Sequence, residues 1–323
     1  MPENTYNPPN TAAVVTSWTD QQDRRTIGLI AVAVTAVVWS WPTIFVKILS
    51  EDFGIFTQSF YRYLSSSVFF FAVSFLFMRD GLKKAAANIR VLIIPAVLVS
   101  LFQICMVTSV YMTNASVPGI VTRMNIVFIV LFSYILFEEE RRVISSKYFL
   151  IANAFVLAGV LGLVLGAPNL DLEFNIGVVV AVLAALFWSI YIVSLKRIVK
   201  IVGPIEAFPF IQLMAALIFL PILLFSEDIS KVTSVSPATN LLLVLSGVTC
   251  VGLGNIMNYV AIGILGSTIP SNLLTFKPVL TVIFAYLLLG EVLTIAQISA
   301  GLILILGCWI MIRKVSTRYE EIS

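Results

Sequence analysis

Ten long apolar runs divide this chain of 323 residues, and they constrain its fold more than any other feature. Each run has about 18 to 27 residues, close to the ~20 that a helix needs to cross a hydrocarbon layer of ~30 Å. The runs are continuous rather than alternating, which argues against membrane-spanning strands. Only 11% of the residues are charged, about half the share in soluble domains, so the chain lacks the polar surface of a soluble enzyme. The sequence therefore predicts an all-α membrane protein with ten transmembrane helices. They are expected at residues 27–49, 53–77, 91–112, 117–137, 148–165, 176–195, 207–225, 240–264, 269–289 and 293–312.

Lysine and arginine are unevenly distributed over the segments that connect these runs. If the N-terminus is cytoplasmic, the inner segments hold fifteen of the 20 basic residues and the outer loops hold only Lys231. Because basic residues near helix ends stay on the cytoplasmic side, we expect a multi-pass protein of the plasma membrane with both termini in the cytoplasm. Residues 1–26 are polar and predict a disordered cytoplasmic tail, and residues 313–323 are expected to form a second cytoplasmic tail.

Several residues recur at a nearly constant distance along the chain, first 149 and later 152 positions apart. The matched pairs are Trp39 and Trp188, Ser40 and Ser189, Lys47 and Lys196, Pro118 and Pro270, and Glu139 and Glu291. Because each half has five spans, the second half must enter the membrane from the opposite side. The sequence thus predicts two inverted five-helix repeats, at residues 27–166 and 176–312, an architecture typical of alternating-access carriers.

Two basic residues near the centre of the predicted bundle are candidates for solute binding. An ionisable side chain at mid-bilayer costs ~2.5 to 3.5 kcal/mol unless it faces protein or water. Lys277 and Arg123 lie within predicted spans, and no Asp or Glu lies near the middle of any span. A solute carboxylate, phosphate or sulfonate would supply the missing negative charge. We therefore expect Lys277 and Arg123 to bind an anionic solute, with outward snorkelling of Arg123 as the alternative.

Arg62 also lies within a span, and we expect a structural or gating role for it through contacts with backbone carbonyls or with Tyr61 and Tyr63. Prolines within spans free backbone carbonyls and kink helices, which suits helices that gate a path. Those in the fourth and ninth spans are Pro118, Pro270 and Pro278.

Amide and aromatic side chains within spans are further candidates. An amide in lipid needs partners, so it bonds either between helices or to solute and water. Trp39 and Trp188 lie near mid-span and either form a cavity wall that stacks a planar solute or pack in the core. The predicted solute contacts besides the two cations are Trp39, Trp188, Gln103, Asn255, Tyr259, Asn272 and Tyr111, and Asn258 is a further amide within a span.

The segments Val37–Lys47, with the sequence VVWSWPTIFVK, and Lys277–Glu291, together with the YRYL motif around Arg62, resemble the EamA-type carriers of the drug/metabolite transporter superfamily. The resemblance covers about residues 27–312. It implies two five-helix repeats and transport of small organic metabolites across a bacterial plasma membrane. Where the family commonly has Glu-Pro in the fourth and ninth helices, this chain has Asn125-Ile126 and Lys277-Pro278. The acidic residue through which a proton could be coupled is therefore missing from both halves.

These features together predict a secondary transporter that moves a small organic metabolite by alternating access. The solute is expected to be anionic or to bear a carboxylate, as an amino acid does. Exchange or facilitated transport is favoured over proton symport, because proton relays use Asp, Glu or His. The alternative is a translocase for lipids or lipid-linked headgroups, since superfamily relatives include such proteins and a cationic cavity would suit a phosphate.

Other classes of protein are less well supported by the sequence. A channel is a further alternative, although the sequence has no repeated filter-like segment and no acidic ring. The chain has no His, and its three Cys lie in separate apolar runs, so neither a metal nor another cofactor is expected. There is no phosphate-binding loop for ATP. The segment Gly252–Asn255 ends in Asn where an intramembrane aspartyl protease needs Asp. We expect no enzyme activity, and we expect the lipid bilayer and a small solute, not nucleic acid, as partners.

Overall fold

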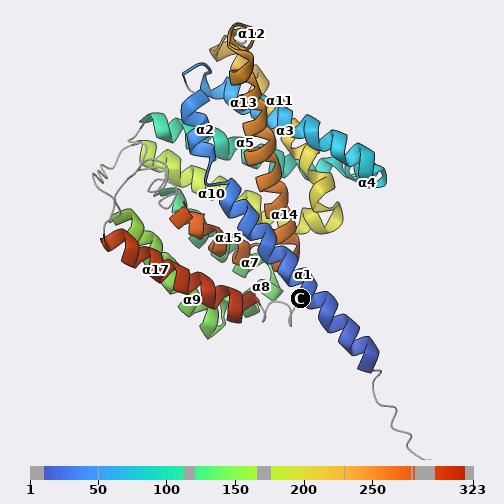
Figure 1. Cartoon of the computed structure of the whole chain (residues 1–323), viewed down its shortest axis with the longest axis vertical. Coiled ribbons are helices and arrows are strands. Elements are labelled where there is room, and N and C mark those ends of the chain that lie inside the picture. Colours follow the sequence, from blue (N-terminus) through green and yellow to red (C-terminus); the bar gives the residue numbers. More distant parts are fainter. Residues whose placement is uncertain are drawn as a thin grey trace, which may run out of the picture.

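The computed structural model describes residues 11–49, 51–112, 121–165, 176–228, 230–277, 279–280 and 295–316. All regular elements in these ranges are helical (Figure 1). Six of the described helices are long and apolar enough to cross a membrane, and there are seven such spans if α8 and α9, which meet at 73°, are counted as one. The expectation of a helical protein with several membrane spans is confirmed.

The elements follow one another in the order of the predicted spans. The first half contains α1 (Thr11–Val38), α2 (Pro42–Leu49), α3 (Ile55–Phe77), α4 (Arg79–Ala87), α5 (Ile89–Met112), η1 (Thr122–Met124), α7 (Asn125–Leu136), α8 (Glu138–Ile144) and α9 (Lys147–Leu165). The second half contains α10 (Ile176–Ile201), α11 (Pro204–Ser226), α12 (Lys231–Ser234), α13 (Pro237–Ser246), η2 (Gly247–Leu253), α14 (Gly254–Leu265), α15 (Thr268–Leu273), η3 (Leu274–Phe276), α17 (Ile295–Ile310) and η4 (Met311–Val315).

The N-terminal region differs from the prediction in two respects. Helix α1 begins at Thr11, whereas a disordered tail was expected over residues 1–26, of which 1–10 lie outside the described ranges. Between Pro9 and Gly28 the chain has neither proline nor glycine, so the helix that forms in the apolar run can extend backward without a new nucleus. The first expected span, 27–49, is also divided between α1 and α2, because Pro42 has no amide hydrogen to continue the helix.

Two short breaks occur at equivalent places in the two halves. The 3-10 turn η1 (Thr122–Met124) precedes α7, and the 3-10 turn η3 (Leu274–Phe276) follows α15. Their first residues are 152 positions apart, which is the separation of the later sequence matches. A tighter turn within an apolar span changes the direction of the side chains that follow it. In both halves the residue directly after the turn is polar, Asn125 in one and Lys277 in the other.

The buried apolar residues form two main clusters. One is built largely on α3, α5, α10 and α11, and the other on α1, α9, α15 and α17. Figure 1 shows α9 and α17 side by side at one edge of the molecule. Their backbones approach closely, because a Cβ atom added at Gly159 would lie 2.7 Å from the backbone nitrogen of Leu304. Small residues allow such close helix pairs in membranes.

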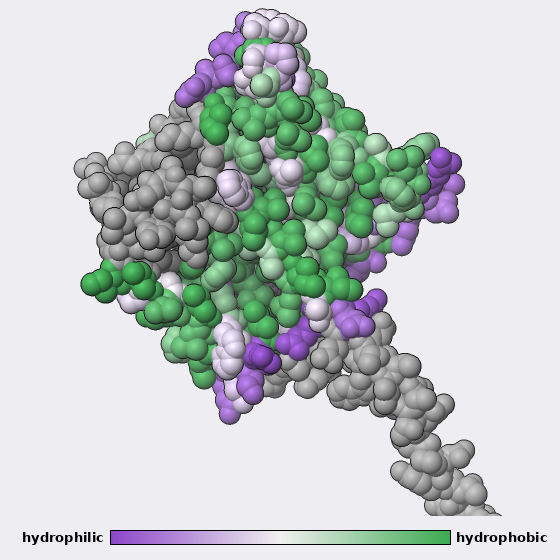
Figure 2. All heavy atoms as spheres, in the orientation of Figure 1, coloured by the Kyte–Doolittle hydropathy of each residue, from purple (hydrophilic) through white to green (hydrophobic). Residues whose placement is uncertain are grey.

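The outer surface is largely apolar. Phe77, Phe225 and Ile295 have exposed fractions of 80%, 94% and 87%. Figure 2 shows apolar residues over the middle of the visible face and polar residues toward its extremities. An apolar surface this extensive is suited to lipid contact rather than to water.

Candidate functional site

A small cavity of about 30 Å³ lies where the two apolar clusters meet. Ile129, Ile192 and Trp188 belong to or pack on the first cluster, whereas Leu274 and Trp39 belong to or pack on the second. The described residues that line the cavity are Trp39, Asn125, Ile129, Trp188, Ile192, Asn258, Ser271, Leu274, Thr275 and Lys277. This volume holds one or two water molecules, so the helices around it must separate before an organic solute can enter.

The sequence repeat relates four of the lining residues. Trp39 and Trp188 are one matched pair, and Asn125 and Lys277, which follow the two 3-10 turns, are 152 positions apart. All four side chains line the same cavity. The cavity is thus formed by equivalent segments of the two halves, although the polar groups that they present differ: an amide in one half and an ammonium in the other.

Lys277 and Trp39 form a cation–π contact at the cavity wall. The Nζ atom of Lys277 lies 4.7 Å from the centroid of the Trp39 ring, within the range in which an ammonium is attracted by an aromatic face. The indole N–H of Trp39 donates a hydrogen bond of 3.1 Å to the carbonyl oxygen of Cys250. That carbonyl lies in the π-helical turn η2, a form of helix whose hydrogen bonds are less regular. The position of the Trp39 ring is therefore fixed on one side, with its face toward the cation.

Aromatic rings extend the wall from Trp39 to α5. The rings of Trp39 and Trp188 meet edge to face, with centroids 5.6 Å apart and planes at 65°. Trp188 in turn lies 4.7 Å from Phe102 and 5.3 Å from Tyr191, measured between ring centroids. Gly254 permits the approach of Trp39, since a Cβ atom there would lie 2.4 Å from the indole nitrogen. The two tryptophans therefore form a rigid apolar surface beside the ammonium.

Four polar side chains complete the lining besides Lys277. They are Asn125, Asn258, Ser271 and Thr275. Asn258 is 1% exposed, and its Nδ2 atom has no hydrogen-bond acceptor among the described residues. A buried donor of this kind costs free energy unless water or a ligand accepts from it. The hydroxyls of Ser271 and Thr275 already donate to the carbonyl oxygens of Ser267 and Asn272. None of the described lining residues is acidic, and the cavity presents the Asn258 amide donor beside the Lys277 ammonium.

Four other predicted contacts are not among the described residues that line the cavity. Asn255 and Asn272 donate to the carbonyl oxygens of Val251 and Thr268, at 2.7 and 3.0 Å, each one turn earlier in the chain. Gln103 donates to the hydroxyl of Ser59 at 3.4 Å, and Tyr259 shares a hydrogen bond with the hydroxyl of Tyr191. These groups find partners within and between helices, which is the structural alternative stated for amides above.

Arg62 lies away from the cavity lining, in α3. Arg62 is 8% exposed, its guanidinium interacts electrostatically with Tyr63, and its Nε atom has no acceptor among the described residues. Its structural or gating role stays a prediction. Pro270 is buried in α15. The side chains of Tyr111 and Arg123, and all of Pro118 and Pro278, lie outside the described residues.

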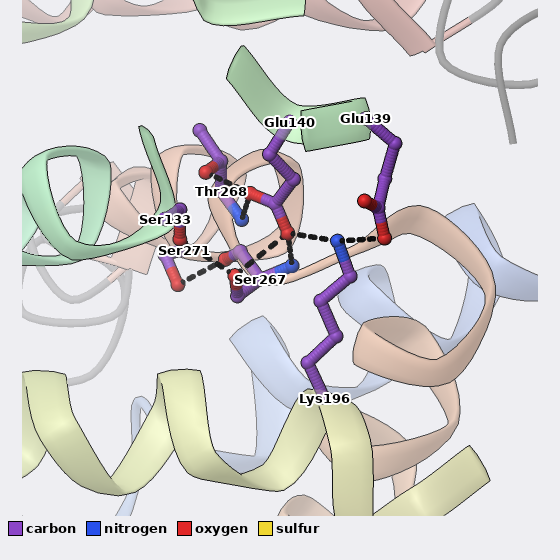
Figure 3. Close-up of polar contacts among 7 residues, drawn as sticks. All are labelled: Ser133, Glu139, Glu140, Lys196, Ser267, Thr268 and Ser271. Atoms are coloured by element: carbon purple, nitrogen blue, oxygen red, sulfur yellow. Dashed lines mark hydrogen bonds and ion pairs between the residues drawn. The ribbon is translucent and has the colours of Figure 1, made fainter. Parts of the chain in front are cut away.

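A cluster of buried polar residues lies near the cavity and was not predicted as a unit. We call it the Glu140 cluster; it consists of Ser133, Glu139, Glu140, Lys196, Ser267, Thr268 and Ser271 (Figure 3). The carboxylate of Glu140 accepts hydrogen bonds from the backbone N–H groups of Ser267 and Thr268, at 2.8 and 3.1 Å, and from both hydroxyls. It therefore caps the first turn of α15, whose amides have no partner within the helix.

Lys196 supplies the positive charge of this cluster. Figure 3 shows its ammonium between two carboxylates, 2.8 Å from Glu140 and 3.0 Å from Glu139. Lys196 and Glu140 are each 1% exposed, whereas Glu139 is 30% exposed. Burial raises the pKa of the Glu139 carboxyl, but a backbone hydrogen bond and the Lys196 ammonium outweigh this effect and hold that pKa below its ordinary value.

The cavity and the Glu140 cluster occupy the same faces of two helices. On α7, Asn125 and Ile129 line the cavity and Ser133 belongs to the cluster. On α10, Trp188 and Ile192 line the cavity and Lys196 belongs to the cluster. Each series has a spacing of four residues, which keeps the side chains on one face and advances ~6 Å per step. On α7 and α10 the cluster residues therefore lie one helical turn beyond the cavity residues Ile129 and Ile192.

The sequence contained one signal for this cluster. Lys196 repeats Lys47, and Glu139 repeats Glu291, but we expected Lys196 to be an anchor near the bilayer edge. The pairing of Lys196 with a carboxylate 56 positions away could not be predicted from periodicity, which identifies a buried face but not its partner.

Comparison with known proteins places the chain in a family. The model of the EamA-like transporter family matches residues 26–165 and again residues 175–313. A protein from Haemophilus influenzae named "Uncharacterized transporter" is 22% identical over 277 residues, which cover 83% of this chain and 91% of that protein. A protein of the same name from Archaeoglobus fulgidus is 25% identical over 294 residues, covering 87% and 96%.

The fold also has a solved counterpart. A chain whose structure is titled "Crystal structure of protein" superposes with a TM-score of 0.74 at 17% identity, covering 90% of this chain and 96% of that chain. At this identity the likeness shows the fold alone. The family match extends over both halves of the chain and confirms the resemblance noted from its motifs. This protein therefore belongs to the EamA-like transporter family and is a multi-pass membrane transporter.

Proposed function

We propose that the protein is a secondary transporter of a small organic anion and that the cavity beside Lys277, Trp39 and Trp188 is its solute site. The observation that carries this proposal is the position of the Lys277 ammonium in the cavity wall, on the face of Trp39. An ammonium that is shielded from water forms strong charge-assisted hydrogen bonds to carboxylates. The two indole rings offer apolar surface for the rest of the solute.

The proposed architecture is ten helices in two inverted five-helix repeats, inserted in the plasma membrane with both termini in the cytoplasm. It is supported by the two family matches, one in each half, and by the equivalent 3-10 turns η1 and η3. Cavity residues related by the repeat come from both halves, as alternating access requires. The present cavity of about 30 Å³ is too small for an organic solute. Opening to one side and then to the other would also enlarge it.

The residues that line the cavity also bear on whether transport is coupled to protons. A proton symporter needs a group in its path that binds and releases a proton. The described lining residues include no carboxylate or imidazole. We therefore propose exchange or facilitated transport, in which the solute charge is balanced by Lys277.

The test is uptake by purified protein in liposomes. Radiolabelled amino acids, monocarboxylates and sugar phosphates would be supplied singly, and fluorescent phospholipids would be scrambled in parallel samples. Saturable uptake of a carboxylate without a pH gradient, together with no movement of lipid, is the expected result. Movement of phospholipid headgroups without solute uptake would instead identify a lipid translocase and overturn the proposal.

A further inference from the structure

We propose that the Glu140 cluster closes the cytoplasmic end of the solute path and that this end opens only when the cluster separates. The inference rests on the proposed function and on its orientation, in which α8 lies at the cytoplasmic side. The cluster continues the faces of α7 and α10 that line the cavity, so it lies on the axis that a solute would follow. Three apolar residues of the cavity lining, Ile129, Ile192 and Leu274, form what we call the apolar layer. On α7 and α10 the cluster residues follow this layer by one turn, and on α15 Ser271 belongs to both the cavity lining and the cluster.

The cluster joins the helices that would have to separate. Ser133 brings α7 into contact with Ser267 at 2.8 Å, and Lys196 brings in α10. The carboxylate of Glu140 holds the first turn of α15 through Ser267 and Thr268. Three helices that carry cavity residues are thus connected through one carboxylate, which belongs to a fourth element, α8.

The energetics of burial favour opening in a single step. Glu140 and Lys196 are each 1% exposed, so loss of Glu140 would leave the Lys196 ammonium with only the partly exposed Glu139, and loss of Lys196 would leave the buried Glu140 carboxylate without a cation. Breaking a buried ion pair in this way is strongly unfavourable, whereas admitting water to both groups at once removes the penalty. The Glu140–Lys196 pair is therefore either formed and shielded from water or separated and hydrated, which is the behaviour of a two-state closure.

The chain contains a matched control for this chemistry. Glu227 caps the first turn of α3 in the same way, accepting from the backbone N–H groups of Phe56 and Thr57, both at 2.9 Å, and from the Thr57 hydroxyl at 2.7 Å. Glu227 has no ion pair with a described residue, and it is not among the described residues of the cavity or the Glu140 cluster. A neutral substitution there removes a comparable cap without acting on the path.

The experiment measures access to the apolar layer and needs no solute. Leu274→Cys is introduced after the native cysteines are replaced by alanine, and the protein is placed in sealed vesicles of known orientation. A membrane-impermeant maleimide is then added to one side at a time. With the intact cluster we expect slow labelling from the cytoplasmic side. Glu140→Gln and Lys196→Met should raise that rate by about tenfold or more, since charged hydrogen bonds are lost, while Glu227→Gln should leave it unchanged.

Ser133→Ala is a second test of the cluster in case the charge variants do not fold. It removes one hydroxyl contact and no charge, and we expect a smaller increase in the same rate. Each variant is included only if it elutes as the unaltered protein does from a sizing column. Equal cytoplasmic labelling of Leu274→Cys in the presence and absence of the cluster substitutions would overturn the inference, as would an equal increase with Glu227→Gln.

The outcomes also separate this inference from the proposed function. If liposomes take up a carboxylate and Glu140→Gln does not change labelling, the function stands and the closure is wrong. If labelling rises as expected but no solute is taken up, the closure stands and the proposed solute class is wrong.

Discussion

The hydroxyl oxygens of Ser133 and Ser267 lie 2.8 Å apart, although 134 positions separate the two residues. This contact joins α7 to the start of α15, and both segments carry residues of the central cavity. At this end the helices are joined by a hydroxyl pair and one carboxylate, in addition to apolar contacts of Ile269 and Leu273 in the second apolar cluster. Polar contacts of this kind can exchange their partners for water without loss of hydrogen bonding, so the two helices can separate at limited cost.

Neutralising Lys277 should impair solute binding. Lys277→Met retains the length of the side chain but removes its charge, and loss of a charge-assisted hydrogen bond of about 1.5 to 3 kcal/mol corresponds to roughly 10- to 100-fold weaker binding. Lys277→Arg should retain much of the affinity. The measurement is the concentration dependence of uptake, using the carboxylate that the unaltered protein transports best. Lys83→Met, which disrupts an exposed pair with Asp80, is the control, and equal losses in both methionine variants would contradict the assignment.

The hydrogen bond from Trp39 to Cys250 should contribute to stability. Trp39→Phe keeps an aromatic ring for Lys277 but leaves the Cys250 carbonyl without its indole donor, which should lower the free energy of unfolding by about 0.5 to 1.5 kcal/mol beyond the loss of ring size. Trp188→Phe makes the same change in size at the repeat-related position. Thermal unfolding in one detergent compares the two. Equal melting temperatures would show that the indole hydrogen bond contributes nothing.

The Glu140–Lys196 pair should show strong coupling in a double-mutant cycle. Glu140→Gln leaves Lys196 with only the partly exposed Glu139, and Lys196→Met leaves the buried Glu140 carboxylate without a cation. Each single variant should therefore destabilise the protein, by up to about 3 to 5 kcal/mol. The double variant has no unpaired charge from this pair and should be more stable than the sum of the two losses predicts. Denaturant titration of all four proteins gives the coupling energy. Additive losses would mean that the two groups do not interact.

An added methyl group at the interface between α9 and α17 should destabilise the protein. A Cβ atom at Gly159 would lie 2.7 Å from the backbone nitrogen of Leu304, so Gly159→Ala must move the helices apart and should cost about 1 to 3 kcal/mol. Gly301 lies on α17, as Leu304 does, and a Cβ atom added at Gly301 would have no atom within 4 Å. Gly301→Ala should be neutral or stabilising by up to ~1 kcal/mol through helix propensity. Melting temperatures that do not differ between the two variants would contradict the close packing.

Hydrophobic run length predicted the helices well and their interruptions poorly. The second expected span, 53–77, corresponds to α3 (Ile55–Phe77), since burial in lipid leaves a helix as the only way to pair backbone groups. A kink at Pro42 is expected from the sequence, but the division of the first span into two helices there, and the 3-10 turns η1 and η3, were not predicted. The 3-10 turns contain no proline or glycine, so neither residue marks them in the sequence.

Some residues that line the cavity could be named from the sequence, and others could not. Trp39 and Trp188 are matched by the repeat, and Lys277 is a cation within a span that has no acidic residue near its middle. These three residues line one cavity, whereas the amides of Asn255 and Asn272 bond to carbonyls of their own helices. In a medium of low dielectric constant a polar side chain takes the nearest acceptor, and sequence spacing does not reveal which acceptor that is. For the same reason, the pairing of Glu140 with Lys196 could not be predicted from the sequence.

Glu140 has no counterpart in the other half of the chain. The position 152 residues later is Val292, although the adjacent Glu139 matches Glu291. The carboxylate that accepts from two amides, two hydroxyls and an ammonium therefore belongs to one end of the proposed path only. In the proposed cycle this asymmetry would favour the conformation that is shut at the cytoplasmic end whenever no solute is bound.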